Sequence, residues 1–204
     1  MTDVCRTHRL PGCLVLGLAT VATCSAFAQS PSDTMGPETY VIEPTHTFVM
    51  WEAKHFGTST SRGRFDRSEG SITIDTIAKT GKAEIRIDLK SISTGTSLFD
   101  KVLQGKNFFN ADEFPTGTFK GDQFKFDGDK VTEIAGTLTL NGKTNAVTLK
   151  ASNYNCYTSP VFRKQVCGGD FDAFIKRSDF GMNYLVPFVS DATRLVIQIE
   201  AIRQ

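Results

Sequence analysis

Apolar and polar residues alternate along several stretches of this chain. Between residues 82 and 89 every second residue is apolar, namely Ala83, Ile85, Ile87 and Leu89. A period of two predicts strands with one buried and one solvated face. The same period recurs at Ile72 and Ile74, at Ile134, Leu138 and Leu140, at Val147, Leu149 and Ala151, and at Leu195, Ile197 and Ile199. Strands at this spacing predict a β-sandwich or an up-and-down barrel.

Two local signals interrupt the strands. Asn141-Gly142 lies between alternating runs, and this pair predicts a two-residue turn flanked by Leu140 and Lys143 because both residues accept positive φ. One helical segment follows Ser97, which with Asp100 resembles a capping box. Its apolar residues Leu98, Phe99, Val102 and Leu103 recur at helical spacing, and Gly105 supplies a stop. An aromatic loop over 108–115 then leads into a strand expected from Thr118.

The first 28 residues have the features of a cleavable export signal. His8 and Arg9 precede an apolar run over 10–22, and Ala26-Phe27-Ala28 fits signal peptidase cleavage. A lipoprotein alternative rests on Cys24, after a loosely lipobox-like stretch. No segment reaches the roughly 18 apolar residues of a membrane span. We therefore expect a signal peptide over 1–28, a flexible lead-in over 29–39 and one exported, not membrane-spanning domain over 40–204.

Removal of that leader leaves a chain without net charge. The full sequence has 23 basic and 22 acidic residues, and the leader contains Arg6, Arg9 and Asp3, so 21 of each remain. A nucleic-acid-binding protein usually carries a basic face. The charge balance therefore argues against nucleic acid as a partner.

Two cysteines, Cys156 and Cys167, remain in the mature chain. An even pair in an oxidising compartment predicts a disulfide. The residues between them include Pro160 and polar side chains, which indicates a long loop closed by its own bridge, worth on the order of 2–3 kcal/mol at most.

The histidines of the mature chain do not indicate a metal site. His46 and His55 are nine residues apart, an odd separation that puts them on opposite faces of a continuous strand. We expect His46 at a strand entry and His55 as a hydrogen-bonded residue of a barrel lining. No nucleophile, zinc or phosphate-loop motif points to catalysis. We therefore predict no catalytic residue and no metal.

The chain contains sixteen phenylalanines, more than one solid core of this size would comfortably pack. As a set they favour a cavity, because a barrel of about eight strands can hold one apolar ligand. Val49, Trp51, Ala53 and His55 fall on one face of a predicted strand. An apolar wall that ends in one polar group suits a lipid with a polar head.

Several separated blocks of the sequence resemble the YceI-like family, also described as polyisoprenoid-binding, lipocalin-like proteins. The resemblance covers residues 40–201 and rests on these blocks: His46-Thr47 with Trp51; Lys54-His55-Phe56-Gly57; Arg62-Gly63-Arg64-Phe65; Asp100, Leu103, Phe108-Phe109 and Phe114-Pro115; the run 136–142; and Arg177-Ser178-Asp179-Phe180-Gly181-Met182. Each block alone is weak, but their number and order together are specific.

The resemblance implies an all-β fold, an antiparallel eight-stranded lipocalin-like barrel with one short helix. It also implies a periplasmic location, frequent homodimers, and an isoprenoid or similar long-chain lipid, such as a quinone, in place of a cofactor. The chain departs from the family in the helix, where many members have Arg and Asp with His two residues later and this chain has Phe99-Asp100-Lys101-Val102. This difference favours a neutral lipid over one with a pyrophosphate-like head.

We predict that the protein binds or carries such a lipid in its barrel. The predicted ligand-binding residues are Val49, Trp51, Ala53, His55, Phe65, Ile85, Ile87, Phe108, Phe109, Phe114, Leu138 and Phe180. Two alternatives remain. One is a lipid-acting hydrolase or isomerase with His55 and a carboxylate as general base, and the other is a protein-interaction module.

Overall fold

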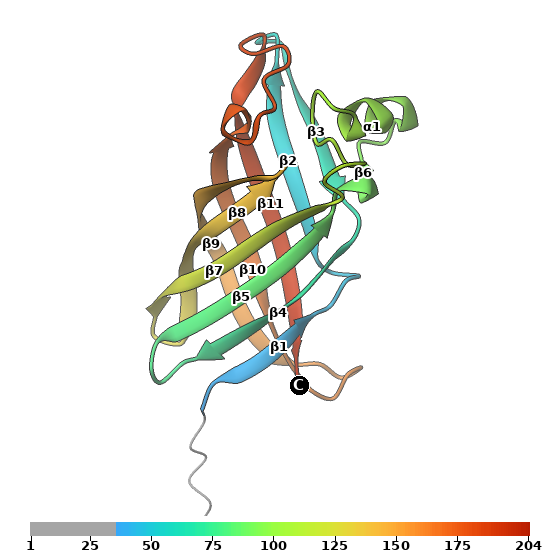
Figure 1. Cartoon of the computed structure of the whole chain (residues 1–204). Coiled ribbons are helices and arrows are strands. Elements are labelled where there is room, and N and C mark those ends of the chain that lie inside the picture. The colour runs from blue at the N-terminus through green and yellow to red at the C-terminus, as the bar shows by residue number, and fades with distance from the viewer. Residues whose placement is uncertain (1–35) are drawn as a thin grey trace, which may run out of the picture. The chain divides into compact units, whose positions relative to one another are not determined.

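The computed structural model describes residues 36–204, so the predicted signal peptide and most of the predicted lead-in lie outside the described residues. The fold is a set of antiparallel strands with one α-helix (Figure 1). The elements are β1 Glu38–Ile42, β2 Phe48–His55, β3 Ser59–Phe65, β4 Ser68–Asp75, β5 Thr80–Asp88, η1 Leu89–Ser91, β6 Ile92–Ser93, α1 Ser97–Gln104, β7 Thr116–Asp127, β8 Lys130–Leu140, β9 Lys143–Thr158, β10 Gln165–Lys176, η2 Arg177–Phe180 and β11 Val189–Arg203. Two predicted boundaries were wrong, since β1 starts inside the expected lead-in and β7 starts at Thr116.

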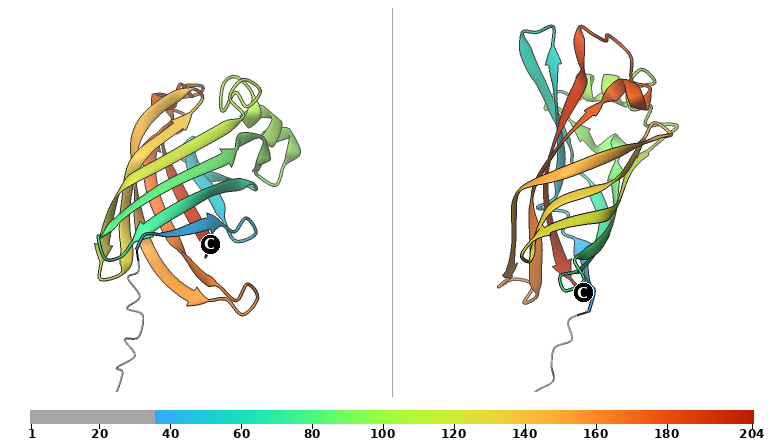
Figure 2. Two further views of the ribbon diagram at one scale, coloured as in Figure 1. Left: turned by 60° about the horizontal axis from the view of Figure 1, so that its bottom comes forward. Right: turned by 90° about the vertical axis from the view of Figure 1, so that its left-hand side faces the viewer.

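Eight strands close into a barrel, as predicted. They pair in the order β1-β4-β5-β7-β8-β9-β10-β11, and β1 pairs again with β11 to complete the ring (Figure 2). Strands β2, β3 and β6 extend the sheet beyond β11. The fold class inferred from alternation and resemblance is confirmed.

Strand β11 has two successive partners along one edge. Its last residues pair with β1, from Tyr40 opposite Arg203 to Ile42 opposite Ala201. Its earlier residues pair with β2, from Phe48 opposite Gln198 to His55 opposite Val189. We call the part of the barrel around β1 the closed half, and the part around β2, β3, β6 and α1 the mouth half.

The connection between β1 and β2 is held by Glu43, a buried carboxylate. Its backbone N–H donates to the Glu200 carbonyl at 2.9 Å, and its side chain accepts hydrogen bonds from the His46 backbone N–H and Thr45 hydroxyl. His46 Nδ1 lies 2.6 Å from the same carboxylate. His46 therefore lies just before strand β2, as expected, and anchors the change from the closed half to the mouth half.

The turn predicted at Asn141-Gly142 is confirmed. Leu140 pairs with Lys143, and the two turn residues have φ of 49° and 69°. Positive φ at both positions is the conformation that Asn and Gly tolerate. The turn joins β8 to β9.

The helix is confirmed, but its predicted capping box is wrong. Thr96 is the N-cap and Ser97 is already the first helical residue. The Asp100 carboxylate instead accepts hydrogen bonds from the backbone N–H and the hydroxyl of Thr94, both at 2.7 Å. The helix ends where the Gly105 N–H bonds the Val102 carbonyl. Asp100 therefore fixes the segment that enters the helix.

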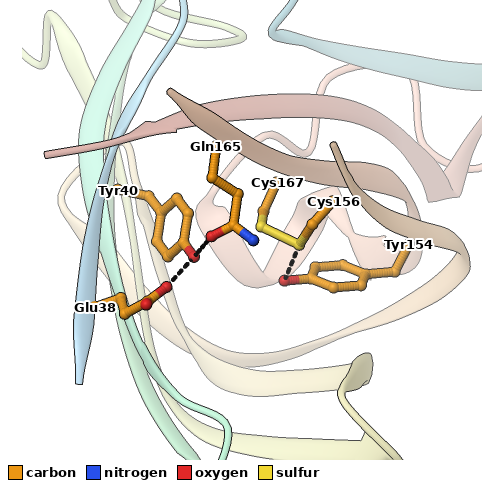
Figure 3. Close-up of a disulfide and its surroundings, with 6 residues drawn as sticks. All are labelled: Glu38, Tyr40, Tyr154, Cys156, Gln165 and Cys167. Atoms are coloured by element: carbon orange, nitrogen blue, oxygen red, sulfur yellow. Dashed lines mark hydrogen bonds between the residues drawn. A yellow bond between two sulfur atoms is a disulfide. The ribbon is translucent and has the colours of Figure 1, made fainter. Parts of the chain in front are cut away.

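The predicted disulfide is present, but it does not close a long loop. Cys156 and Cys167 are directly opposite each other on β9 and β10, and only residues 159–164 connect the two strands. The expectation failed because both strands continue past the bridge. Figure 3 shows the Tyr154 hydroxyl beside the Cys156 sulfur, at 3.7 Å.

A polar group accompanies the disulfide in the closed half. The Tyr40 hydroxyl lies 2.5 Å from a Glu38 oxygen and 2.8 Å from the Gln165 side-chain oxygen (Figure 3). Burial, reinforced by the charge of Glu38, raises the pKa of Tyr154 to about 12. This end of the barrel therefore combines a disulfide with one buried tyrosine, Tyr40, and one half-buried tyrosine, Tyr154.

Candidate functional site

The mouth half contains a cavity of about 420 Å³. This volume lies in the usual range of small-molecule pockets. Nine predicted residues line it: Val49, Trp51, Ala53, His55, Phe65, Ile87, Phe108, Phe109 and Leu138. Whether they bind a lipid stays a prediction, but the structure brings them together around one space.

Strand β2 forms one wall of this cavity. Val49, Trp51 and Ala53 are each only 7% exposed and point inward, while Met50 and Glu52 on the other face are half-buried. His55 continues the inward row but is exposed, at the end of the strand. Its ring packs edge-on against Phe56, with ring centroids 4.8 Å apart. Its side chain makes no hydrogen bond to any residue within 36–204, contrary to our expectation for a lining histidine.

Small side chains open the space between the walls. Ala53 lies opposite Ser61 on β3 and Thr193 on β11, so three small residues form one row across the sheet. In the next row Trp51 lies opposite Gly63. A Cβ at Gly63 would approach a Trp51 ring carbon to 2.6 Å, so only glycine lets the indole lie flat against β3. Among the described residues the indole N–H has no hydrogen-bond partner.

The opposite wall comes from α1 and the aromatic loop that follows it. Leu103 is buried, and Phe99 and Val102 are exposed to solvent while they also line the cavity. Phe109 packs edge-on against Phe65, with ring centroids 5.2 Å apart. This wall is entirely apolar, which makes the cavity suited to hydrocarbon.

Arg177 is the charged residue that sequence analysis did not place in the lining. Its guanidinium is buried and donates to three backbone carbonyls, those of Met182 at 2.7 Å, Val189 at 2.9 Å and Ser190 at 2.9 Å. Burial lowers the pKa of Arg177, but a guanidinium stays protonated in proteins. Arg177 therefore holds the loop before β11 in place at the mouth. Arg177 belongs to one of the sequence blocks that carry the family resemblance. Its hydrogen bonds to backbone carbonyls depend on the conformation of the loop before β11, which the sequence does not reveal.

Other lining residues were also missed. They are Ser61, Leu89, Phe99, Val102, Leu103, Leu140, Ile175, Met182, Tyr184, Leu185, Val189, Thr193 and Leu195. Leu89, Leu140 and Leu195 already stood on predicted inward faces, so the period-two pattern could have found them. The loop residues Tyr184 and Leu185 carry no such pattern.

Three predicted residues do not line this cavity. Ile85 lines a separate space of about 50 Å³ in the closed half. It shares a face with Ile87, but Ile85 lies opposite Phe119 on β7 whereas Ile87 lies opposite Gly117. Phe114 covers the turn at Gly142, where an added Cβ would lie 2.7 Å from its ring. Phe180 is 1% exposed and belongs to the hydrophobic core.

The described part of the chain, residues 36–204, has no cluster of three or more His, Cys, Asp or Glu side chains that could hold a metal ion. It also has no helix with the length and apolar character needed to cross a bilayer.

Comparisons with known proteins agree with this barrel. A UPF0312 protein of Pseudomonas aeruginosa is 34% identical over 163 residues, which cover 79% of this chain and 84% of the relative. The crystal structure of a Campylobacter jejuni YceI protein superposes with a TM-score of 0.62 at 26% identity, over 74% of this chain and 90% of that one. A polyisoprenoid binding domain from Saccharophagus degradans has the same fold, with a TM-score of 0.57 at 14% identity, over 81% and 98% of the two chains.

The match to a known family covers nearly all of the described part. Residues 40–201 match the YceI-like domain. These limits run from β1, which closes the ring, to the end of β11, which β1 meets. The chain therefore belongs to the YceI-like family.

Proposed function

We propose that the protein binds and carries a long-chain amphiphilic lipid, with an isoprenoid or an isoprenoid quinone as the best candidate. The observation that carries this proposal is the cavity of about 420 Å³ whose walls are mainly apolar side chains. The name of the S. degradans domain with the same fold adds support for an isoprenoid.

The hydrophobic effect accounts for the affinity of such a site. Each methylene removed from water contributes about 0.8 kcal/mol, so a tail of about ten buried carbons contributes about 8 kcal/mol. Loss of translational and rotational freedom offsets part of this gain. The tail would therefore supply most of the affinity, and selectivity among tails of similar length would be modest.

The polar groups of the lining suggest an orientation for the ligand. His55 lies at the open end of β2, whereas Val49 and Phe65 lie at the inner end of the same wall. A head group would therefore stay near His55 at the mouth, with the tail running inward. The expected location is the periplasm, which is supported by the leader ending in Ala26-Phe27-Ala28.

Native mass spectrometry of freshly purified protein tests the proposal. We expect a long-chain lipid of defined mass to co-purify with the protein. The mass of the polypeptide should be unchanged after the lipid is removed. Conversion of the added lipid into a product would instead support the alternative hydrolase or isomerase. An empty protein that takes up no lipid would overturn the proposal and favour an interaction module.

The fluorescence of Trp51, the single tryptophan, gives a second measurement in the same samples. Its indole lies in the cavity wall. Addition of an isoprenoid alcohol to delipidated protein should shift or quench the emission in a saturable way. No change at any concentration would count against binding in this cavity.

A further inference from the structure

Several large apolar side chains that line the cavity, or that are next to a lining residue in the chain, face solvent. We call this set the mouth rim: Phe56, Leu98, Phe99, Val102, Tyr184, Leu185 and Phe188. Leu98 is 73% exposed and Phe188 is 62% exposed. A soluble protein exposes single apolar residues without consequence, but a contiguous apolar patch marks an interaction site.

The mouth rim is built by three segments that the fold holds together. Phe56 follows β2 and Phe188 precedes β11, and their rings stack with centroids 5.6 Å apart. The Phe56 backbone N–H donates to the Phe188 carbonyl at 2.7 Å. Because Arg177 also binds the loop before β11, the exposed rings rest on an ordered base.

The mouth rim continues into the cavity. Phe99 and Val102 of α1, together with Tyr184 and Leu185, are exposed on one side and line the cavity on the other. Figure 1 shows the β2–β3 turn, the loop before β11 and α1 toward one end of the barrel, away from the β9–β10 loop. A hydrocarbon tail that leaves the cavity therefore meets apolar side chains before it meets water.

Three lysines lie close in sequence to residues of the mouth rim. Residues 181–190 contain no charged side chain. The carboxylate of Asp100 is engaged by Thr94. Lys54, Lys101 and Lys106 are exposed, and within residues 36–204 none of them lies in an ion pair. Phenylalanine, leucine and tyrosine flanked by lysine are typical of surfaces that insert into the headgroup region of anionic membranes.

We propose that the mouth rim docks the protein on an anionic lipid bilayer. The inserted rim would place the cavity entrance against the membrane, so that a lipid passes between bilayer and barrel without crossing water. This inference rests on the proposed function, because it assigns the surface from which the cavity is loaded.

Co-sedimentation with vesicles tests this proposal. The probes are vesicles of phosphatidylcholine with a minority of phosphatidylglycerol, and vesicles of phosphatidylcholine alone. We expect wild-type protein to bind the anionic vesicles more strongly, and the advantage to shrink at high salt. The double variant Phe56→Ser, Phe188→Ser should lose at least about tenfold in partitioning, since two buried aromatic rings contribute that much or more.

Matched controls come from exposed apolar residues elsewhere on the barrel. Phe174 is 72% exposed on β10 and Ile77 is 70% exposed in the β4–β5 turn. Phe174→Ser and Ile77→Ser should bind vesicles like wild type. Equal partitioning of the rim variant and these controls, or no vesicle binding by wild type, would overturn the proposal.

Two further measurements separate the remaining explanations. Trp51 emission with cyclodextrin-delivered isoprenoid alcohol, in the absence of vesicles, should respond equally in wild type and the rim variant. If wild-type Trp51 emission does not respond to the isoprenoid alcohol, lipid binding in the cavity is refuted. The vesicle experiment would still decide whether the mouth rim binds membranes. If light scattering finds a wild-type dimer and a monomeric rim variant, the mouth rim is a subunit interface and the docking proposal is wrong.

Discussion

The closed half and the mouth half of the barrel differ in the size of the side chains that face inward. In the closed half Phe119, Phe124, Tyr154 and Phe171 line an interior space of about 50 Å³. In the mouth half the inward positions include Ala53, Ser61 and Thr193, and about 420 Å³ stays open.

This difference shows that the number of aromatics did not create the cavity. Four phenylalanines line it, namely Phe65, Phe99, Phe108 and Phe109. Others fill the closed half or lie exposed, such as Phe174. The number of phenylalanines led us to expect a cavity, and a cavity is present. It lies where the small residues Ala53, Ser61 and Thr193 meet across three strands.

Removal of a large aromatic ring should give the largest difference in stability loss between the two halves. Phe171 is 3% exposed in the filled half, so Phe171→Ala should lower the free energy of unfolding by about 3–5 kcal/mol. Phe109 is half-buried beside an existing space, so Phe109→Ala should cost less than half as much. Urea unfolding of both variants measures the difference. Equal losses would mean that the two halves are equally well packed.

The disulfide should act on the closed half alone. Cys156 and Cys167 are 11 residues apart in sequence, and a loop of this size predicts a loss of about 2–3 kcal/mol when the bridge is removed. We expect this loss in the double variant Cys156→Ser, Cys167→Ser, measured by urea unfolding. Binding of an isoprenoid, followed by Trp51 emission, should be unchanged. Weakened binding would show that the two halves are coupled.

Addition of a large ring should block lipid uptake in the mouth half and lower stability in the closed half. Ala53→Trp places an indole in the open cavity, so it should block lipid uptake and leave stability nearly unchanged. Ala83→Trp places the same ring beside the small space of the closed half, where overpacking costs about 1–3 kcal/mol. Lipid uptake and urea unfolding are measured for both. An Ala53→Trp protein that unfolds, or that binds lipid normally, would show that Ala53 does not face free space.

Alkaline pH should weaken the closed half. The Tyr154 phenol titrates near pH 10 when unfolded, and burial raises its folded pKa to about 12. Between these values the unfolded state gives up the proton first, so stability is full below pH 10 and is lost as pH rises. Each buried phenol contributes a slope of about 1 kcal/mol per pH unit, and Tyr40, whose pKa burial also raises, contributes alongside Tyr154. Tyr154→Phe should reduce this slope in unfolding experiments above pH 10, and an unchanged slope would exclude Tyr154 as its source.

Much of the fold could be predicted because its signals are local. The period-two runs identify inward residues, and the Asn141-Gly142 turn and the helix stop at Gly105 depend on neighbours in sequence. The capping of α1 could not be predicted in the same way. Asp100 binds Thr94, which lies outside the helix, rather than Ser97.

The candidate site was predicted less completely, because alternation gives the face of a residue but not its depth in the barrel. Ile85 and Ile87 have the same pattern, yet their partners on β7 are Phe119 and Gly117. Phe119 lines the small space of the closed half, whereas Gly117 leaves room for Leu89 and Leu140, which line the larger cavity. Such pairings join distant parts of the chain, so a single strand does not reveal them.

The pairing of β1 with β11 also bears on how the protein folds. Tyr40 meets Arg203, about 160 residues away, and this contact completes the ring. Contacts of such long sequence separation form slowly, because the entropy of the intervening chain is lost before they contribute. The hairpins from β7 to β10 pair strands that are adjacent in sequence, so they can form before the last strand is in place. The ring closes when β1 pairs with the last residues of β11. Until then β1 has one edge without a partner strand.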